Sequence, residues 1–159
     1  MLYHSFSLAL VLVLFASCSK DKDDPVTPAP TNTCGVAGAR LQANLDGEAF
    51  CANASLFASL AVDVLTVNGI SQQGATLTLE LDSLSVGTHN MTEGTNSLLF
   101  TTTLGLAYRT SDGDPGSVTI TSHDTSAKRI QGTCSADLYS PLGGVPKAIS
   151  GNFDLYYIE

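Results

Sequence analysis

The sequence predicts an all-β fold for residues 40–159, an antiparallel β-sandwich or partly open barrel of about eight or nine strands. Apolar and polar residues alternate over several short segments rich in Val, Ile and Thr, which is typical of half-buried strands. Turn signals such as Asp46-Gly47, 72–74 and 112–116 separate these segments at regular intervals. No segment of this region combines the length, the apolar spacing and the caps of an amphipathic helix.

The first predicted element is a hairpin over residues 41–52. Its two arms alternate in polarity, and Asp46-Gly47 between them is the dipeptide preferred in a two-residue type I′ turn. A loop of that length places Ala43 opposite Phe50 on the buried face. The same register turns Cys51 to the opposite face of the hairpin, because side chains alternate along a strand.

The next segment, residues 55–67, fits two patterns. Its apolar residues could be spaced as on a helix, but the β-branched bias favours a strand over about 61–67, ended by Asn68-Gly69. The strand that follows, residues 76–82, is the clearest in the chain because its alternation is strict. Its inward-facing residues are Leu77, Leu79 and Leu81.

The middle of the domain predicts two further strands. Residues 88–91 form a short strand after Gly87, and residues 97–103 form a longer one. We expect the longer strand to continue past a bulge or bend at Gly105, with Leu104, Leu106 and Tyr108 keeping its parity. A strong turn signal follows at residues 112–116.

The last third of the chain predicts a hairpin and a final strand. The hairpin joins residues 117–122 to residues 127–139, and its inward-facing residues are Val118, Ile120, Ile130, Cys134, Ala136 and Leu138. A last segment begins at residues 145–149 and ends with the inward-facing residues Phe153, Leu155 and Tyr157. Gly151 is expected to interrupt it.

The first 17 residues resemble a bacterial lipoprotein signal peptide. The apolar run 8–15 fits the core of a signal peptide and is far shorter than the ~20 residues that a transmembrane helix needs. The segment Phe15-Ala16-Ser17-Cys18 is similar to a lipobox, in which the cysteine becomes the lipidated first residue after cleavage. This resemblance implies a signal peptide over residues 1–17 and lipidation of Cys18. The alternative is an ordinary secretory signal with an incidental cysteine.

Residues 18–39 are predicted to form a disordered tether that begins with the lipidated Cys18. Residues 19–24 are charged, and residues 25–33 combine Pro, Thr and Asn, a composition that cannot pack into a core. The acidic cluster after Cys18 resembles the surface-export signal of Bacteroidota lipoproteins. These features predict an outer-membrane protein attached through the lipid on Cys18, and the export signal implies exposure at the cell surface.

Residues 40–159 are predicted to form one domain, and their motifs resemble those of a known family. The motifs are Leu65-x-Val67-x-Gly69, Leu77-x-Leu79-x-Leu81, Gly87-x-His89 and Ile149-Ser150-Gly151-x-Phe153. Over residues 41–157 the chain is similar to an uncharacterised β-rich domain of Bacteroidota lipoproteins. The resemblance implies the fold and the envelope location, and it implies no activity. Cys134 stands where this pattern leads us to expect an aromatic residue.

The composition limits the possible partners. The chain has 15 acidic and 7 basic residues and a formal net charge of −8 at pH 7. An acidic surface repels phosphate backbones, so nucleic acid is excluded as a partner. No basic amphipathic helix is present, so membrane contact is expected through the lipid alone. No cofactor is expected.

Three cysteines remain after Cys18, and all three are disulfide candidates: Cys34, Cys51 and Cys134. An odd number permits one intrachain bridge and leaves one thiol. Strand parity faces Cys134 inward and Cys51 outward, and Cys34 can fold back onto Cys51 from ahead of the first strand. A bulge that shifts the register would instead pair Cys51 with Cys134. We favour a bridge that includes Cys51, with either partner.

Candidate catalytic and metal-binding residues are few. His89 and His123 are the imidazoles of the domain, and they lie in separate contexts without a G-x-S-x-G motif, so a catalytic triad would have to assemble in space. Asp112 and Asp114 are weak calcium candidates, because the other oxygen ligands of an EF-hand loop are missing. We predict no metal site. We interpret the segment at His123 and the segment that contains Asp112 and Asp114 as polar turns.

Four tyrosines, Tyr108, Tyr139, Tyr156 and Tyr157, could form a carbohydrate platform, but adjacent strand residues face opposite ways, so only one of the last two could join it. The sequence therefore predicts a lipid-anchored, exported envelope protein with a non-catalytic binding or structural role, and not an enzyme. The alternative is a surface module that binds glycan or protein. A hydrolase is the third hypothesis.

Overall fold

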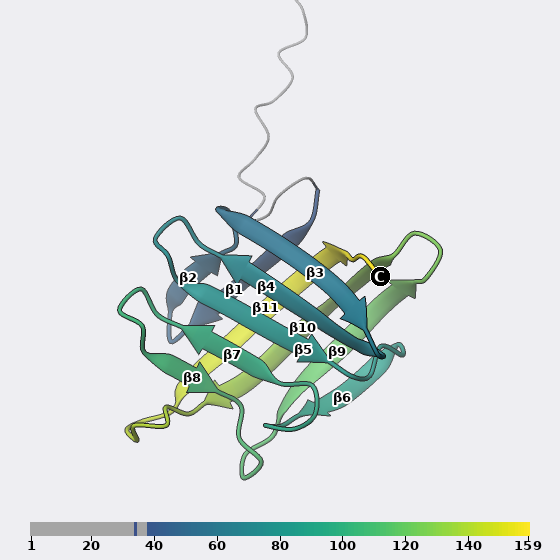
Figure 1. The fold of residues 1–159 in the computed structure, drawn as a ribbon. Helices are drawn as coiled ribbons and strands as arrows, with labels where there is room; N and C mark the ends of the chain where they lie inside the picture. Colours follow the sequence, from purple (N-terminus) through teal and green to yellow (C-terminus); the bar gives the residue numbers. More distant parts are fainter. Residues whose placement is uncertain (1–33, 35–37) are drawn as a thin grey trace, which may run out of the picture.

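The computed structural model describes Cys34 and residues 38–159, which form two facing antiparallel β-sheets (Figure 1). The described residues contain eleven strands and no helix. The strands are β1 (Arg40–Leu45), β2 (Glu48–Cys51), β3 (Ser55–Ala61), β4 (Val64–Ile70), β5 (Thr76–Leu81), β6 (Gly87–Met91), β7 (Leu98–Thr101), β8 (Ala107–Arg109), β9 (Gly116–Asp124), β10 (Arg129–Leu138) and β11 (Lys147–Tyr156). The predicted all-β sandwich is confirmed, in place of a partly open barrel. Its eleven strands exceed the predicted number of about eight or nine.

The two sheets differ in how the chain assembles them. The five-stranded sheet has the order β3-β4-β5-β7-β8, so its strands keep their sequence order, and the chain leaves this sheet once to form β6. The six-stranded sheet has the order β2-β1-β11-β10-β9-β6, so it combines the two ends of the domain. The strands of the two sheets cross one another in Figure 1. Isolated bridges connect the layers at two edges, between Ser59 and Ile158 and between Arg109 and Tyr139.

The first hairpin has the predicted register. Ala43 pairs with Phe50 and Gln42 pairs with Cys51, so Phe50 is buried and Cys51 faces the other way. Asp46 and Gly47 have φ values of 50° and 91°, as a type I′ turn requires. The Asp46 carboxylate also accepts a hydrogen bond from the backbone N–H of Ala148 at 2.9 Å, which fixes the turn against the start of β11.

The segment after this hairpin forms two strands where one was predicted. The chain reverses at Val62-Asp63, between β3 and β4, with φ values of 50° and 63°. Positive φ is unusual for a β-branched residue, so the sequence carries no ordinary turn signal here. Val62 is 95% exposed, which shows that it occupies the tip of the hairpin and not a buried strand position.

Two glycines that were expected to end or interrupt strands lie inside them. Gly69 belongs to β4, and a Cβ atom there would lie 2.7 Å from Leu41 Cδ2 and 2.8 Å from Ala52 Cβ in the facing sheet. Gly151 belongs to β11, and a Cβ atom there would lie 2.8 Å from the carbonyl oxygen of Gln42. Both predictions were wrong because these glycines permit close approach instead of breaking the strand.

The strand predicted to run past Gly105 also ends earlier. β7 stops at Thr101, and the chain turns back at Gly105, which has a φ of 79°, to form β8. Leu104 is 86% exposed and Leu106 is also exposed, so they do not continue the inward parity. The apolar residues of this loop suggested a strand, although they lie at the tip of a hairpin.

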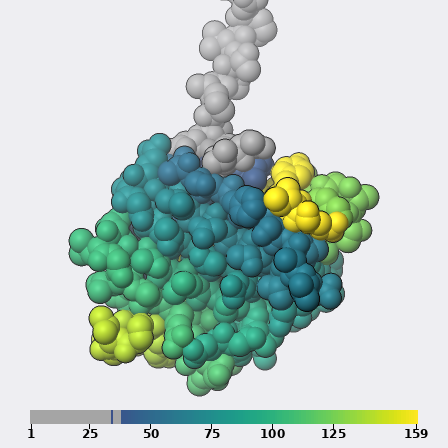
Figure 2. All heavy atoms as spheres, viewed as in Figure 1, coloured from purple at the N-terminus to yellow at the C-terminus, as the bar shows by residue number. Residues whose placement is uncertain are grey.

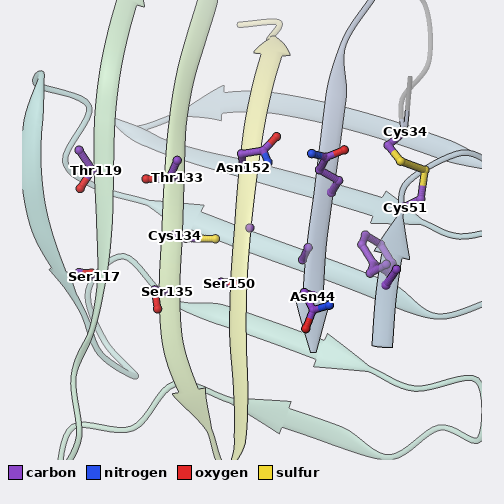
Figure 3. A pocket seen from close by; sticks show the side chains of 15 residues that line it. Cys34, Asn44, Cys51, Ser117, Thr119, Thr133, Cys134, Ser135, Ser150 and Asn152 are labelled. Carbon is purple, nitrogen blue, oxygen red and sulfur yellow. A yellow bond between two sulfur atoms is a disulfide. The ribbon is translucent and has the colours of Figure 1, made fainter. Parts of the chain in front are cut away.

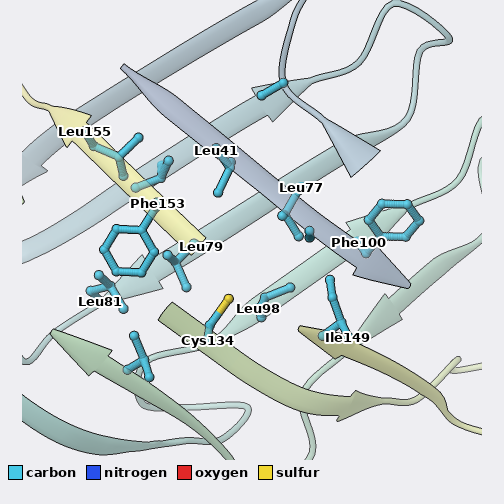
Figure 4. Close-up of a cluster of buried hydrophobic side chains, with 14 of the residues drawn as sticks. Leu41, Leu77, Leu79, Leu81, Leu98, Phe100, Cys134, Ile149, Phe153 and Leu155 are labelled. Atoms are coloured by element: carbon cyan, nitrogen blue, oxygen red, sulfur yellow. The ribbon is translucent and has the colours of Figure 1, made fainter. Parts of the chain in front are cut away.

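The core lies between the sheets and has the predicted parity. Its members include Leu77, Leu79 and Leu81 from β5 and Ile130, Cys134, Ala136 and Leu138 from β10 (Figure 4). The rings of Phe50 and Phe100 meet edge to face with centroids 5.8 Å apart, so the core includes an aromatic contact between the two layers.

Figure 2 views the five-stranded side, where the loop at 139–146 and the C-terminal residues protrude at opposite corners. Among the residues described, no helix has the length and apolar character needed to cross a bilayer. The predicted signal peptide at 1–17, the lipidated Cys18 and most of the tether at 18–39 lie outside the described residues.

Candidate functional site

The outer side of the six-stranded sheet carries two continuous rows of neutral residues. Strand register places the residues of each row side by side across all six strands. One row is Asn90, Ser117, Ser135, Ser150, Asn44 and Ala49; the other is Thr88, Thr119, Thr133, Asn152, Gln42 and Cys51. We call these twelve residues the polar face. All of them are exposed or half-buried.

The polar face is hollowed. A depression of about 630 Å³ covers its centre, where Thr119, Thr133 and Asn152 stand in line across three strands (Figure 3). A second depression of about 440 Å³ shares Thr133, Asn152 and Gln42 with the first. A third, of about 390 Å³, shares Ser117 and Ser135 with it. The three depressions are therefore one open groove across the sheet.

No residue of the polar face carries a charge. Its side chains are hydroxyls, amides, one Ala and the half-cystine Cys51. Hydroxyls and amides both donate and accept hydrogen bonds, and a neutral surface loses its hydration at lower cost than a charged one. The face therefore suits a ligand that is polar and uncharged.

A charged cluster borders one end of the polar face. The Arg129 guanidinium donates two hydrogen bonds to the Asp154 carboxylate, at 2.8 and 2.7 Å, and Gln131 Nε2 donates a third at 2.9 Å. The Arg129 bonds are the main reason that the pKa of the Asp154 carboxyl is lowered. The same guanidinium lies 5.4 Å from the centroid of the Tyr156 ring, which is 48% exposed. This cluster holds an aromatic ring one outward position beyond the Asp154 end of the groove.

The cysteines occupy the two sides of the same sheet. Cys34 forms a disulfide with Cys51, and its carbonyl oxygen accepts a hydrogen bond from the Leu41 N–H at 3.1 Å. These contacts fix Cys34 at the edge of the polar face. Cys134 has a free, buried thiol that faces the core, so the alternative Cys51–Cys134 bridge is excluded. Burial raises the pKa of the Cys134 thiol to about 12.

The two histidines are engaged with the loop between β5 and β6. His89 Nε2 lies 2.8 Å from the Ser85 carbonyl oxygen and 3.5 Å from Ser85 Oγ. A carbonyl only accepts, so Nε2 carries a proton and cannot also take one from the Ser85 hydroxyl. His123 Nδ1 donates to the Leu84 carbonyl at 3.1 Å, and its Nε2 accepts from the buried Tyr157 hydroxyl at 2.9 Å. Both imidazoles thus hold the loop in place.

The weak calcium candidates are engaged by the protein itself. Asp112 Oδ1 accepts a hydrogen bond from the Glu93 N–H at 3.0 Å, and Asp114 Oδ2 accepts one from the Tyr139 hydroxyl at 2.8 Å. The second bond raises the pKa of Tyr139. Across residues 38–159 and Cys34, no group of three or more His, Cys, Asp or Glu side chains could hold a metal ion.

The tyrosines do not gather into one platform. Tyr156 and Tyr157 face opposite ways as predicted, with Tyr157 buried and Tyr156 on the outer side of the six-stranded sheet. Tyr108 lies near Lys147, whose Nζ is 5.6 Å from its ring centroid. Of these residues, Tyr156 is the one that continues the line of outward side chains on β11 past Asn152 and Asp154.

Sequence reasoning missed the polar face. Its residues come from six strands between residues 42 and 152, so no local motif contains them. One signal was available: the outward positions Thr133 and Ser135 of β10, and Ser150 and Asn152 of β11, are all uncharged. Exposed strand positions that repeatedly avoid charge, in a chain of net charge −8, point to a surface with a role beyond solubility.

Comparison with known proteins finds one family. Residues 38–154 match the model of a domain of unknown function (DUF6252). No curated protein and no solved structure matches the chain. The matched region begins ahead of β1 and ends within β11, so it includes the whole polar face.

Proposed function

The chain belongs to the DUF6252 family of domains of unknown function, and on that premise we propose a lipid-anchored, exported envelope protein whose domain binds a ligand without catalysis. The anchor is the lipid on Cys18, after cleavage of residues 1–17. The location is the outer membrane of a Bacteroidota cell, with the domain exposed at the cell surface. Support for this part comes from the lipobox-like segment 15–18 and the charged tether behind it.

The attachment point of the tether supports an anchored domain. Cys34 is held to β2 by its disulfide and to β1 by the hydrogen bond from Leu41. A tether that begins at Cys18 therefore joins the domain at the edge of the six-stranded sheet. The disulfide at that position would distribute a pulling force on the tether over β1 and β2 instead of β1 alone. We therefore expect β2 to stay paired with β1 when the anchored chain is pulled.

The observation that carries the binding role is the uncharged, hollowed polar face. Burial does not call for it, because exposed positions accept charged side chains as well as neutral polar ones. An open groove lined by donors and acceptors is what a binding surface for a polar ligand requires. The hydrogen bonds of His89 and His123 favour a non-catalytic role over the hydrolase hypothesis, because both rings serve the loop before β6.

The proposal has one two-part test. Wild-type protein should fractionate with the outer membrane and be degraded when whole cells are treated with protease, whereas Cys18→Ala should be released as soluble protein. The soluble Cys18→Ala protein should then sediment with washed cell envelopes. Adding Thr133→Lys in the centre of the polar face should abolish that sedimentation.

A matched control separates the polar face from the rest of the surface. Thr78 on β5 pairs with Asn68 on β4, just as Thr133 pairs with Asn152, but on the outer side of the other sheet. Thr78→Lys should leave envelope binding unchanged. Retention in the membrane of the double variant Cys18→Ala and Thr133→Lys, which lacks both proposed attachments, would overturn the anchor. Equal envelope binding by both lysine variants would overturn the role of the polar face.

A further inference from the structure

We infer that the ligand of the polar face is a neutral polysaccharide chain, bound in the groove across the six-stranded sheet and packed against Tyr156. This inference rests on the proposed binding role and adds the chemical class of the ligand. It is carried by the charge, the hydrogen-bonding groups, the shape and the single exposed aromatic ring of this surface.

The charge of the groove selects the ligand class. The twelve residues of the polar face are neutral, Asp154 at one end of the groove is paired with Arg129, and the carboxylate at the other end belongs to Asp137. No cationic cluster is present in the groove to bind phosphate, sulfate or uronate groups, because Arg40 is the one further cation among its lining residues. The net charge of −8 also repels a polyanion. An uncharged polymer needs no cations in the groove and is not repelled by the negative charge of the protein.

The hydrogen-bonding groups match a polyhydroxylated ligand. Each sugar hydroxyl is both a donor and an acceptor, and so are the hydroxyls of Thr119, Thr133 and Ser135. The amides of Gln42 and Asn152 offer a donor and an acceptor side by side on neighbouring strands. Such groups can both donate a hydrogen bond to a sugar hydroxyl and accept one from it. An aliphatic side chain can do neither, and a carboxylate, ammonium or guanidinium group can do only one of the two.

The shape suits a chain molecule. The three depressions share lining residues, so the groove continues from Asp137 and Ala148 at one end to Asp154 at the other. Along β11 the outward residues of the groove run from Ala148 to Asp154, a distance of roughly 20 Å at ~3.3 Å per residue, and Tyr156 is the next outward residue beyond it. This length accommodates several sugar units, and the open sides of the groove let the polymer extend beyond it.

Tyr156 provides the apolar contact. The C–H groups of a sugar ring pack against the electron-rich face of an aromatic ring. Tyr156 is half exposed on the same side of β11 as Asn152, and Arg129 lies over its ring while bonded to Asp154. The ring is therefore held in place before the ligand arrives, which lowers the entropic cost of binding.

A protein partner fits this surface less well. Protein interfaces are centred on buried aromatic, aliphatic or Arg side chains. The two rows of the polar face contain one aliphatic side chain, Ala49, and no aromatic ring. Peptide addition to a strand edge would not use this surface at all, since it engages backbone groups at β2 or β6.

The test measures retention of the soluble Cys18→Ala protein in gels that contain defined polysaccharides. The neutral probes are glucan, mannan, galactan and xylan, and the anionic probes are polygalacturonate and heparin. We expect retention by at least one neutral probe and by neither anionic one. Asn152→Ala and Tyr156→Ala should each weaken it about tenfold, since each removes one ligand contact. Tyr156→Phe should preserve it, because the ring makes the contact.

The controls define what overturns the inference. Asn68→Ala, on the opposite face, should bind as the parent protein does, and circular dichroism should show that all variants are folded. Retention by the anionic probes alone, or neutral retention that survives Thr133→Lys, would contradict a neutral glycan in this groove. Envelope binding that depends on Thr133 without retention by any neutral probe would also reject the glycan, and would leave the proposed binding role standing with a protein as partner.

Discussion

The two outer faces of the sandwich follow the same alternation and yet differ in chemistry. The outer face of the five-stranded sheet is mixed: its longest row contains Phe57, Asn68, Thr78, Leu99 and Arg109. Phe57 and Leu99 are exposed there, and Arg109 forms an ion pair with Glu93 at 2.6 Å. The polar face of the six-stranded sheet has neither an exposed aromatic ring nor a charge within its two rows.

This difference separates what the fold needs from what a ligand needs. The five-stranded sheet shows that an outer face of this fold can carry apolar, polar and charged residues together and still pair its strands. The uniform polar face is therefore not a condition for folding. Its uniformity is best explained by the ligand that we propose for it.

The two sheets also differ in how tightly their glycines are enclosed, and this predicts the largest effect. A Cβ atom on Gly132 in β10 would lie 2.4 Å from the Thr119 carbonyl oxygen and 2.5 Å from Phe153 Cζ. Gly69 in β4 faces only side-chain atoms. Gly132→Val should lower the free energy of unfolding by more than about 3 kcal/mol, and Gly69→Val by about 1–3 kcal/mol, because backbone yields less than side chains.

Urea denaturation monitored by circular dichroism measures both changes. Gly94→Ala is the matched control, since a Cβ atom there meets nothing within 4 Å. If Gly132→Val were no more destabilising than Gly69→Val, the six-stranded sheet would be the more adaptable of the two.

The second prediction concerns the disulfide at the edge of the polar face. Cys34 and Cys51 are 17 residues apart, and opening a loop of that size typically costs about 3 kcal/mol. Cys51→Ala should lower the free energy of unfolding by that amount, and amide hydrogen exchange should become faster in β2. The strands of the five-stranded sheet should lose protection by no more than that amount, because the disulfide affects them only through global unfolding. A loss of protection in β2 no greater than that in the five-stranded sheet would show that the disulfide stabilises the whole domain and not its edge in particular.

The third prediction concerns the inner side of the same sheet. Burial raises the pKa of the Cys134 thiol from 9.0 to about 12. The unfolded chain therefore loses this proton first, so stability is full below pH 9 and falls towards pH 12. The slope attributable to this thiol is about 1.4 kcal/mol per pH unit. Cys134→Ala should remove that slope in urea titrations, and an unchanged slope would assign it to other groups.

The smallest effect separates the ion pairs of the two sheets. In the pair beside the polar face the Arg129 and Asp154 side chains are 40% and 14% exposed, whereas Arg109 and Glu93 are 52% and 48% exposed. Arg129→Met should destabilise the domain more than Arg109→Met does, because the more exposed pair contributes less. Asp154 has a lowered pKa, so the contribution of its pair is present above about pH 4 and disappears as the pH falls below that value. Thermal unfolding at pH 7 and pH 3 checks both statements.

The sequence alone determined the parts of this protein that depend on neighbours along the chain. Alternation fixed the inward parity of β5 and β10, and Asp46-Gly47 fixed the register that buries Phe50 and turns Cys51 outward. Local signals were insufficient at Val62-Asp63, where a turn forms without Gly or Asn. They were also insufficient at Gly69, because a glycine is needed there only for the close approach of Leu41 and Ala52 from across the core.

The tertiary structure alone decided which strands became neighbours, and with that the polar face. β1 pairs with β11, which places Gln42 beside Asn152 although most of the domain separates them in the sequence. It also decided that Cys51 pairs with Cys34 while Cys134 stays a buried thiol. Contacts of this kind follow from packing two sheets into one core, which depends on the whole chain at once. The uncharged outward positions of β10 and β11 could be noticed in the sequence, but the surface built from six strands could be outlined only after the strands were placed.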